Sequence, residues 1–265
     1  MTDPAAIYEE WFVPAVFAPL ARAVISASDI SPDARVLDVA CGTGIVARTV
    51  APLVGSEGRV AGLDFSPAML AVARRAAERD ELSIEWVEGS ALDLPFADGA
   101  FDLVFCQMGV QFFPDRARAA AEMHRVLAPA GRVALTTWRG LDLHPFPAAL
   151  ARAVQERVGS AALGMPFVLG DSAILAGLLQ QAGFVEVSVE PVEIEADYAR
   201  PREYVALQIR ASAAGIAALQ GLPAAELDAI IAAIEGDMAN PVREVTEGDR
   251  LRFPMHGIVA RGAKT

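Results

Sequence analysis

The segment Arg35-Val36-Leu37-Asp38-Val39-Ala40-Cys41-Gly42-Thr43-Gly44 is the most informative part of this chain. Its first half is apolar and rich in β-favouring residues, as a strand covered on both faces of a sheet should be. Gly42 and Gly44 allow a sharp turn and a close approach of a ligand to the backbone. Helical spacing of apolar residues follows from Ile45. The segment therefore predicts a strand, a turn and a helix N-terminus at the carboxyl edge of a parallel sheet, where ligands bind in open α/β folds.

Acidic residues end two successive predicted strands. Asp38 ends the first, and Asp64 ends the second, which starts at Arg59. A carboxylate beside the turn suits an amino group, and one at the next strand tip can accept hydrogen bonds from both hydroxyls of a ribose. The chain has no Gly-x-Gly-x-x-Gly and no Gly-Lys-Ser/Thr, which disfavours a dinucleotide fold or a P-loop. The alternative is an ordinary tight connection between a strand and a helix.

Four more segments, in order and at the usual spacing, resemble the Rossmann-like (class I) S-adenosylmethionine-dependent methyltransferases. The resemblance covers roughly residues 30 to 140 and is closest to the small-molecule enzymes that include the quinone-biosynthesis methyltransferases. It implies S-adenosyl-L-methionine as cofactor and S-adenosyl-L-homocysteine as product. The four segments are VAGLDFSPAML (60–70), GSALDLPF (89–96), FDLVFC (101–106) and EMHRVLAPAG (122–131).

Strands and helices alternate up to Trp138, which predicts an α/β fold with a parallel sheet. With the resemblance, we expect a seven-stranded doubly wound sheet, mostly parallel, with helices on both faces and a helical cap. The resemblance places the last strand, 251–260, antiparallel between strands five and six. The expected parts are N-terminal lid helices (1–30, interrupted by Pro14 and Pro19), a cofactor-binding core (31–140) and the rest of the sheet (141–265), with cap insertions at about 141–170 and 196–250.

Composition limits the function classes. A net charge of −12 argues against nucleic acid as a partner, because phosphate binding needs a basic surface. The start of the chain does not read as a signal peptide, and no apolar run is long enough to span a membrane. The two cysteines have no metal-like spacing, so we expect a reduced, cytoplasmic protein. The sequence leaves the oligomeric state open.

The resemblance implies a role for each residue of the cofactor site. Asp38 would orient the methionine amino end, and Asp64 would hold the ribose hydroxyls. Ala40 stands where the family has a glycine, Ser90 where it often has an acidic residue, and Ala130 within its usual Pro-Gly-Gly turn; we expect the two alanines to be harmless to the chemistry. The full set of expected cofactor contacts is Asp38, Ala40, Gly42, Gly44, Asp64, Phe65, Met69, Ser90, Ala91, Cys106 and Gln107.

Methyl transfer is an in-line attack on a sulfonium carbon, so the protein chiefly positions the reactants and, for poor nucleophiles, removes a proton. The candidates for proton transfer are His144, His256 and Tyr8, because histidine titrates near neutral pH and both histidines fall near the ligand edge. We assign His124, inside a helix, to the surface or to packing. No metal-binding set stands out. The candidate substrate contacts are Trp11, Phe12 and Gln111; the aromatic residues belong either to a lid or to a helix packed on the flank of the sheet.

The leading hypothesis is a methyltransferase acting at oxygen, nitrogen or carbon of a small, largely apolar metabolite. A second hypothesis keeps the cofactor pocket for non-methylating chemistry, such as a cyclisation. A third is a non-catalytic binding module of the same fold, which the intact pocket residues argue against. A nicotinamide dehydrogenase ranks last, because its glycine fingerprint is missing.

Overall fold

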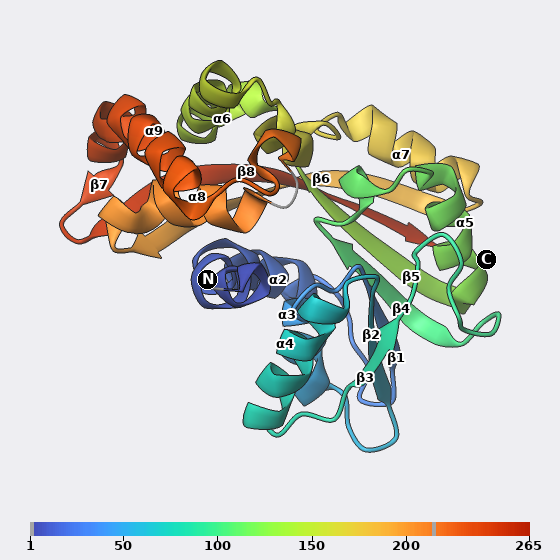
Figure 1. Ribbon diagram of the computed structural model, residues 1–265. Helices are drawn as coiled ribbons and strands as arrows, with labels where there is room; N and C mark the ends of the chain where they lie inside the picture. The colour runs from blue at the N-terminus through green and yellow to red at the C-terminus, as the bar shows by residue number, and fades with distance from the viewer. Residues whose placement is uncertain (1–2, 214–215) are drawn as a thin grey trace.

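Strand β1 (Arg35–Val39) lies inside a mixed sheet in the computed structural model, which describes residues 3–213 and 216–265 (Figure 1). The strand order is β3-β2-β1-β4-β5-β8-β6. Strand β8 pairs antiparallel with β5 and β6, and the pairs among β1 to β5 are parallel, so the predicted doubly wound sheet is confirmed. The other strands are β2 (Arg59–Asp64), β3 (Glu85–Glu88), β4 (Phe101–Gln107), β5 (Leu127–Trp138), β6 (Val185–Ala199), β7 (Thr246–Glu247) and β8 (Arg250–Ala263).

Helices cover both faces of the sheet and divide the core into two apolar clusters. Helices α2 (Ala18–Ser26) and α3 (Ile45–Val50) pack on one face with the cap. Helices α5 (Arg116–Val126) and α7 (Ser172–Gln181) pack on the other. Because β1 is covered on both sides, all its residues after the first are buried, as its apolar sequence predicts.

Local signals fix where several helices begin and end. Helix α4 (Pro67–Arg79) follows Ser66, whose side chain accepts the Met69 N–H, and proline occupies the first turn. Asp115 and Asp171 cap α5 and α7 in the same way. The short helices are η2 (Ala51–Leu53), η3 (Val110–Phe112), η4 (Leu141–Leu143), η5 (Ala162–Phe167), η6 (Pro201–Glu203) and η8 (Ala217–Leu219).

The N-terminal segment is one continuous helical path, and the expected interruption at Pro14 is wrong. It runs through α1 (Pro4–Ile7), the π-helix η1 (Tyr8–Phe17) and α2. Pro14 sits inside η1, and the Ala18 N–H donates to the Val13 carbonyl, five residues back. The wider π turn accommodates a residue that lacks an N–H and would clash in an α-helix. Pro19 lies in the first turn of α2, where proline is tolerated.

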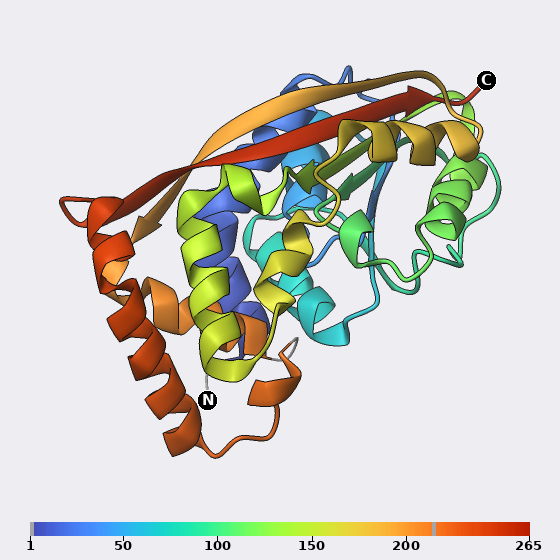
Figure 2. The same ribbon diagram turned by 90° about the horizontal axis from the view of Figure 1, so that it is seen from above.

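The cap is built from α6 (Pro145–Val158), α8 (Tyr204–Ser212) and α9 (Ala224–Glu244), beside the long ribbon of β6 and β8 (Figure 2). Strand β6 continues to Ala199 rather than ending near 192, so the first residues expected in the second cap insertion extend the sheet instead. The apolar side chains of the cap and of the N-terminal helices form one continuous cluster. The N-terminal helices and the cap are therefore packed together in this structure.

Candidate functional site

The turn after β1 has a backbone that favours glycine at three positions. Ala40, Gly42 and Gly44 have φ angles of 55°, 56° and 81°. A Cβ at Gly44 would lie 2.2 Å from the Trp86 ring, so only glycine fits there. Ala40 tolerates its left-handed conformation at a cost that a glycine would avoid. The turn brings the N-terminus of α3 to the carboxyl edge of the sheet.

Asp38 and Asp64 flank this turn and are both buried. The side chain of Asp38 is 1% exposed and accepts the Ala47 N–H of α3 at 3.1 Å. Burial raises its pKa to about 8. Asp64 is 6% exposed and accepts the N–H groups of Gly42 at 2.8 Å and Ser66 at 2.9 Å. Burial also raises the pKa of Asp64, and its backbone hydrogen bonds oppose that rise.

Tyr8 brings the N-terminal helices to the glycine turn. Its ring carbon Cε1 lies 3.8 Å from the place where a Cβ on Gly42 would stand, and its ring stacks on Phe17 with a 5.0 Å centroid separation. Burial, and then the charge of Asp64, raise the pKa of Tyr8 well above its usual value. The phenol is therefore neutral at physiological pH.

Trp11 and Phe12 point into the cap. Each ring lies 5.9 Å from Tyr198 of β6, and the Arg200 guanidinium lies 4.7 Å from the Trp11 ring centroid. Tyr198 in turn packs on Tyr204 with a 4.9 Å centroid separation. The aromatic front of the first helices is thus buried against the cap.

The expected adenine-side residues follow the neighbouring strands β2 and β3: Phe65 comes directly after β2, Met69 lies in α4, and Ser90 and Ala91 lie in the loop after β3. Phe65 is 79% exposed, and Met69 is half-buried. Ser90 is exposed and its hydroxyl accepts the Leu92 N–H, whereas Ala91 is buried. The exposed Phe65 ring, adjacent in the chain to a buried carboxylate, is available to a planar ligand.

The end of β4 carries buried polar atoms that have no protein partner in the described part of the chain. Gln107 donates to the Phe17 carbonyl at 3.1 Å, which joins the sheet to the N-terminal helices, and its Oε1 is unpaired. Gln111 donates to the Met108 carbonyl at 3.0 Å and leaves its own Oε1 unpaired. Cys106 is fully buried, which raises the pKa of its thiol to about 12.

The two candidate histidines meet, but they point in different directions. His144 is fully buried: Nε2 accepts the His256 N–H at 3.0 Å, and Nδ1 lies 3.0 Å from the Gly140 carbonyl. Burial lowers its pKa. The His256 ring lies on the outside of the ribbon, with Nδ1 3.1 Å from Glu193. Backbone groups occupy both His144 ring nitrogens, so a general-base role for either histidine stays a prediction that these contacts do not favour.

Sequence reasoning missed two contributors to the site. The Trp86 ring of β3 covers both Gly44 and Gly62, where a Cβ would lie 2.4 Å from the ring. Arg48 of α3 pairs with Glu9 of η1 and so ties the N-terminal helices to the glycine turn. Neither contact has a local signature in the sequence, because Trp86 covers glycines on other elements and the ion pair joins residues 39 positions apart.

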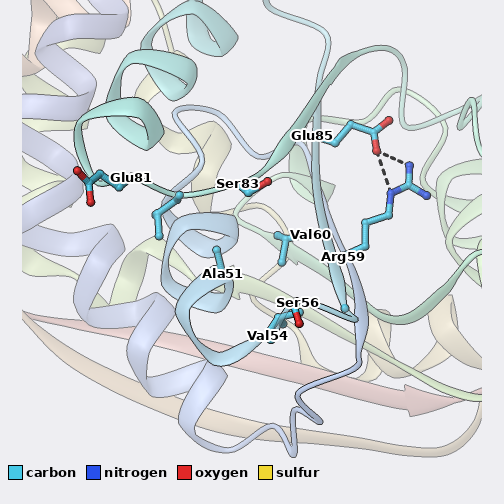
Figure 3. A pocket seen from close by; sticks show the side chains of 11 residues that line it. Ala51, Val54, Ser56, Arg59, Val60, Glu81, Ser83 and Glu85 are labelled. Carbon is cyan, nitrogen blue, oxygen red and sulfur yellow. Dashed lines mark hydrogen bonds and ion pairs between the residues drawn. The ribbon is translucent and has the colours of Figure 1, made fainter.

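A second hollow of the surface lies away from the glycine turn. A groove of about 440 Å³ lies at the opposite edge of the sheet, between the loops around 54–58 and 81–83 (Figure 3). Its charged residues are exposed, and Arg59 and Glu85 pair with each other. Within residues 3–213 and 216–265, no group of three or more His, Cys, Asp or Glu side chains could hold a metal ion, and no helix is long and apolar enough to cross a membrane.

Comparison with known proteins matches residues 36–131 to a family model described as a methyltransferase domain. The chain is 48% identical over 115 residues to a demethylmenaquinone methyltransferase of Thermus thermophilus, covering 42% of this chain and 50% of that protein. It is also 48% identical over 107 residues to the chloroplastic 2-phytyl-1,4-beta-naphthoquinone methyltransferase of Arabidopsis thaliana. That match covers 38% of this chain and 40% of the Arabidopsis protein. The chain spans about half the length of the curated relatives it matches.

Solved structures show the same fold over most of the chain. The YcgJ protein of Bacillus subtilis aligns with a TM-score of 0.61 and 20% identity, covering 92% of this chain and 97% of that one. Phosphoethanolamine N-methyltransferase 2 of Haemonchus contortus, solved with S-adenosylhomocysteine, aligns with a TM-score of 0.60 and 19% identity. The alignment covers 98% of this chain and 56% of that one. The [4+2]-cyclase SpnF aligns with a TM-score of 0.56 and 22% identity, over 93% of this chain and 80% of that one. The predicted resemblance to Rossmann-like methyltransferases is confirmed.

Proposed function

We propose that this chain is an S-adenosyl-L-methionine-dependent methyltransferase that methylates oxygen, nitrogen or carbon of a small, largely apolar metabolite. The observation that carries the proposal is the pair of buried carboxyls, Asp38 and Asp64, on adjacent strands beside the glycine turn. Both lie inside the segment that matches the methyltransferase domain. The named activities of the relatives support the reaction class, although those relatives align over only part of this chain.

The residues present fit a cationic cofactor. Asp38 and Asp64 are buried carboxyls, and a ligand that carries an ammonium and a sulfonium would supply the positive charge that they lack. Asp38 would face the methionine end, Asp64 the ribose, and Phe65 with Met69 the adenine. The remaining proposed contacts are Ala40, Gly42, Gly44, Ser90, Ala91, Cys106 and Gln107, and the product would be S-adenosyl-L-homocysteine.

The cofactor supplies an activated methyl group, so the chain's own residues chiefly orient the partners and exclude water. In this proposal Tyr8 acts as a neutral phenol that donates a hydrogen bond near the glycine turn. His144 holds the loop after β5 through its backbone contacts, and His256 holds the outside of the ribbon. No proton-transfer step is needed for an acceptor that is already nucleophilic.

The aromatic cluster where lid and cap meet supports an apolar acceptor. Trp11 and Phe12 face Tyr198, and Gln111 offers an unpaired, buried acceptor oxygen near the end of β4. The relatives named for naphthoquinone and menaquinone compounds make a hydroxylated aromatic ring the first acceptor to test. We propose the domain limits 1–30, 31–140 and 141–265 as functional parts, a small-molecule rather than nucleic-acid partner, and a cytoplasmic setting, which the two free cysteines favour.

A methyl-transfer assay tests the proposal directly. Purified protein is incubated with S-adenosylmethionine labelled in its methyl group and with panels of phenols, quinols and amines. Labelled product should form with an apolar ring acceptor and should be lost in Asp64→Ala. Cofactor binding without transfer to any acceptor would favour the second candidate, a non-methylating enzyme such as a cyclase, since a cyclase shares this fold.

A further inference from the structure

Asp38 and Asp64 have unequal hydrogen bonding in an otherwise similar setting. Asp64 accepts two backbone N–H groups, at 2.8 and 2.9 Å, which stabilise its charged form. Asp38 accepts one, at 3.1 Å, and is the more buried of the two. The charge of Asp64 also disfavours a second negative charge on Asp38. Of the two carboxyls, Asp38 is the one that is more easily neutralised by a proton.

No cation compensates Asp38 within the part of the chain that the structure describes. The cation on the helix that contacts it is Arg48, and this guanidinium is engaged by Glu9 at 2.7 Å and Asp80 at 3.5 Å. Arg74, on α4, reaches the Trp86 carbonyl at 3.4 Å and is exposed. The ion pairs of the described residues include neither Asp38 nor Asp64.

The other titratable groups near Asp38 are neutral at pH 7. They are the phenol of Tyr8 on η1 and the thiols of Cys41, in the turn, and Cys106, at the end of β4. Burial raises the pKa of all three groups above the usual values. None of them can supply a positive charge, so without the ligand an ionised Asp38 would be a buried anion whose one protein contact is the Ala47 N–H, with no cation to balance it.

We propose that Asp38 carries a proton while the site is empty and releases it to solvent when the cationic cofactor binds. This inference rests on the proposed function, because it takes the ligand to carry an ammonium and a sulfonium group. A buried carboxylate is costly without a partner and becomes favourable beside a positive charge, which is what the ligand brings. The one bond that breaks is the carboxyl O–H: its electron pair stays on Asp38, and the proton is taken up by the buffer.

Proton release makes binding depend on pH in a defined direction. Binding must displace the proton at any pH below the pKa of Asp38 in the empty protein, about 8. The association constant therefore rises with pH, by about tenfold per unit between pH 6 and 7 for one proton released. The rise levels off as the pH approaches 8, where Asp38 is already ionised and the amino group of the ligand begins to lose its own proton.

Calorimetry in several buffers measures how many protons are released when the ligand binds. Titration of the intact protein with S-adenosylmethionine at pH 7, in phosphate, HEPES and Tris, gives a binding heat that varies with the ionisation heat of the buffer. The slope should correspond to nearly one proton released. Asp38→Asn, which keeps the shape but cannot ionise, should bind without releasing a proton, and Tyr8→Phe should release the proton as the wild type does. Wild-type binding with no dependence on buffer would overturn the inference.

Infrared spectroscopy of the empty protein keeps the inference testable even if a variant binds poorly. At pH 7 the wild type should show a carbonyl band of a protonated carboxylic acid that is missing in Asp38→Asn. Absence of that band would overturn the inference whatever the cofactor does. If the band is present but S-adenosylmethionine fails to bind, the proposed function fails while the protonated Asp38 stands.

Discussion

Arg48 of α3 holds Glu9 of η1 in a buried ion pair: its Nη2 donates to both carboxylate oxygens, at 2.7 and 2.9 Å. The two side chains are only 8% and 14% exposed. The Arg48 N–H also donates to the Gly44 carbonyl of the glycine turn, at 2.8 Å. This pair therefore connects the helix that carries Tyr8 to the backbone that is proposed to bind the cofactor.

Glu9→Gln should release the N-terminal helices from the turn. We expect the free energy of unfolding to fall by about 3 kcal/mol, because the buried Arg48 guanidinium loses the nearer of its two carboxylate partners and keeps only Asp80. We also expect faster association of S-adenosylmethionine, followed by stopped-flow tryptophan fluorescence, because Tyr8 is held less firmly over Gly42. The control is Asp237→Asn, which breaks an exposed pair with Arg157 in the cap and should leave the association rate and the melting temperature nearly unchanged. An unchanged association rate in Glu9→Gln would show that this ion pair does not hold Tyr8 over the glycine turn.

Gly44→Ala should disrupt the turn severely. Its φ of 81° is unfavourable for alanine, and the new Cβ would lie 2.2 Å from the Trp86 ring. The matched control is Gly159→Ala at the end of α6, where φ is 67° and nothing lies within 4 Å, so it carries the backbone strain of about 1–2 kcal/mol without the clash. Urea denaturation should show a clearly larger loss for Gly44→Ala, and Trp86→Leu should restore part of it. Equal losses in the two glycine variants would rule out the steric role of Trp86.

Ala130→Gly should stabilise the protein. Ala130 is exposed and has a φ of 62°, which costs an alanine roughly 1–2 kcal/mol, more than the added chain entropy of glycine. We expect a net gain of about 0.5 kcal/mol and a small rise in melting temperature. Ala128→Gly, two residues earlier and outside the left-handed region, should instead be destabilising. A lower melting temperature for Ala130→Gly would show that the turn is not strained.

Lys264 is the only lysine of the chain, and it closes the C-terminal end of α5. Its Nζ donates to the carbonyls of His124 at 2.9 Å, Arg125 at 3.2 Å and Leu127 at 2.7 Å. Lys264→Met keeps the apolar stem and should lower the free energy of unfolding by about 1 kcal/mol, measured in urea. Arg202→Met, which removes an exposed positive charge elsewhere, should have little effect. Equal small effects would mean that the lysine contacts do not stabilise the helix end.

The sequence predicted most of the sheet because its signals are local. Apolar strands that end in Asp38 and Asp64, and a cap at Ser66, specify elements and their order without any tertiary information. The two alanines that depart from the family's glycines, Ala40 and Ala130, both fall at positive φ in the structure. The resemblance thus located the strained positions, although their cost was not expected.

Long-range side-chain contacts could not be predicted in the same way. Pro14 signals a break in an α-helix, yet the path stays helical because a π-helix accommodates the proline. His144 has the right place in the chain for a catalytic base. However, its Nε2 accepts a hydrogen bond from the backbone N–H of His256 on β8, more than a hundred residues later. Contacts of this kind depend on which residues far apart in the chain pack against each other. The periodicity of apolar residues in the sequence carries no information about that packing.

The glycine turn and its two carboxyls, Asp38 and Asp64, are proposed to bind S-adenosylmethionine. The most direct test is calorimetric titration of the wild type and of Asp64→Ala, with Glu57→Ala, an exposed carboxylate at the opposite edge of the sheet, as control. We expect the wild type and Glu57→Ala to bind, and we expect the affinity of Asp64→Ala to be at least about tenfold weaker, because charged hydrogen bonds to the ligand are lost. No binding by the wild type, or equal binding by Asp64→Ala, would contradict this proposal.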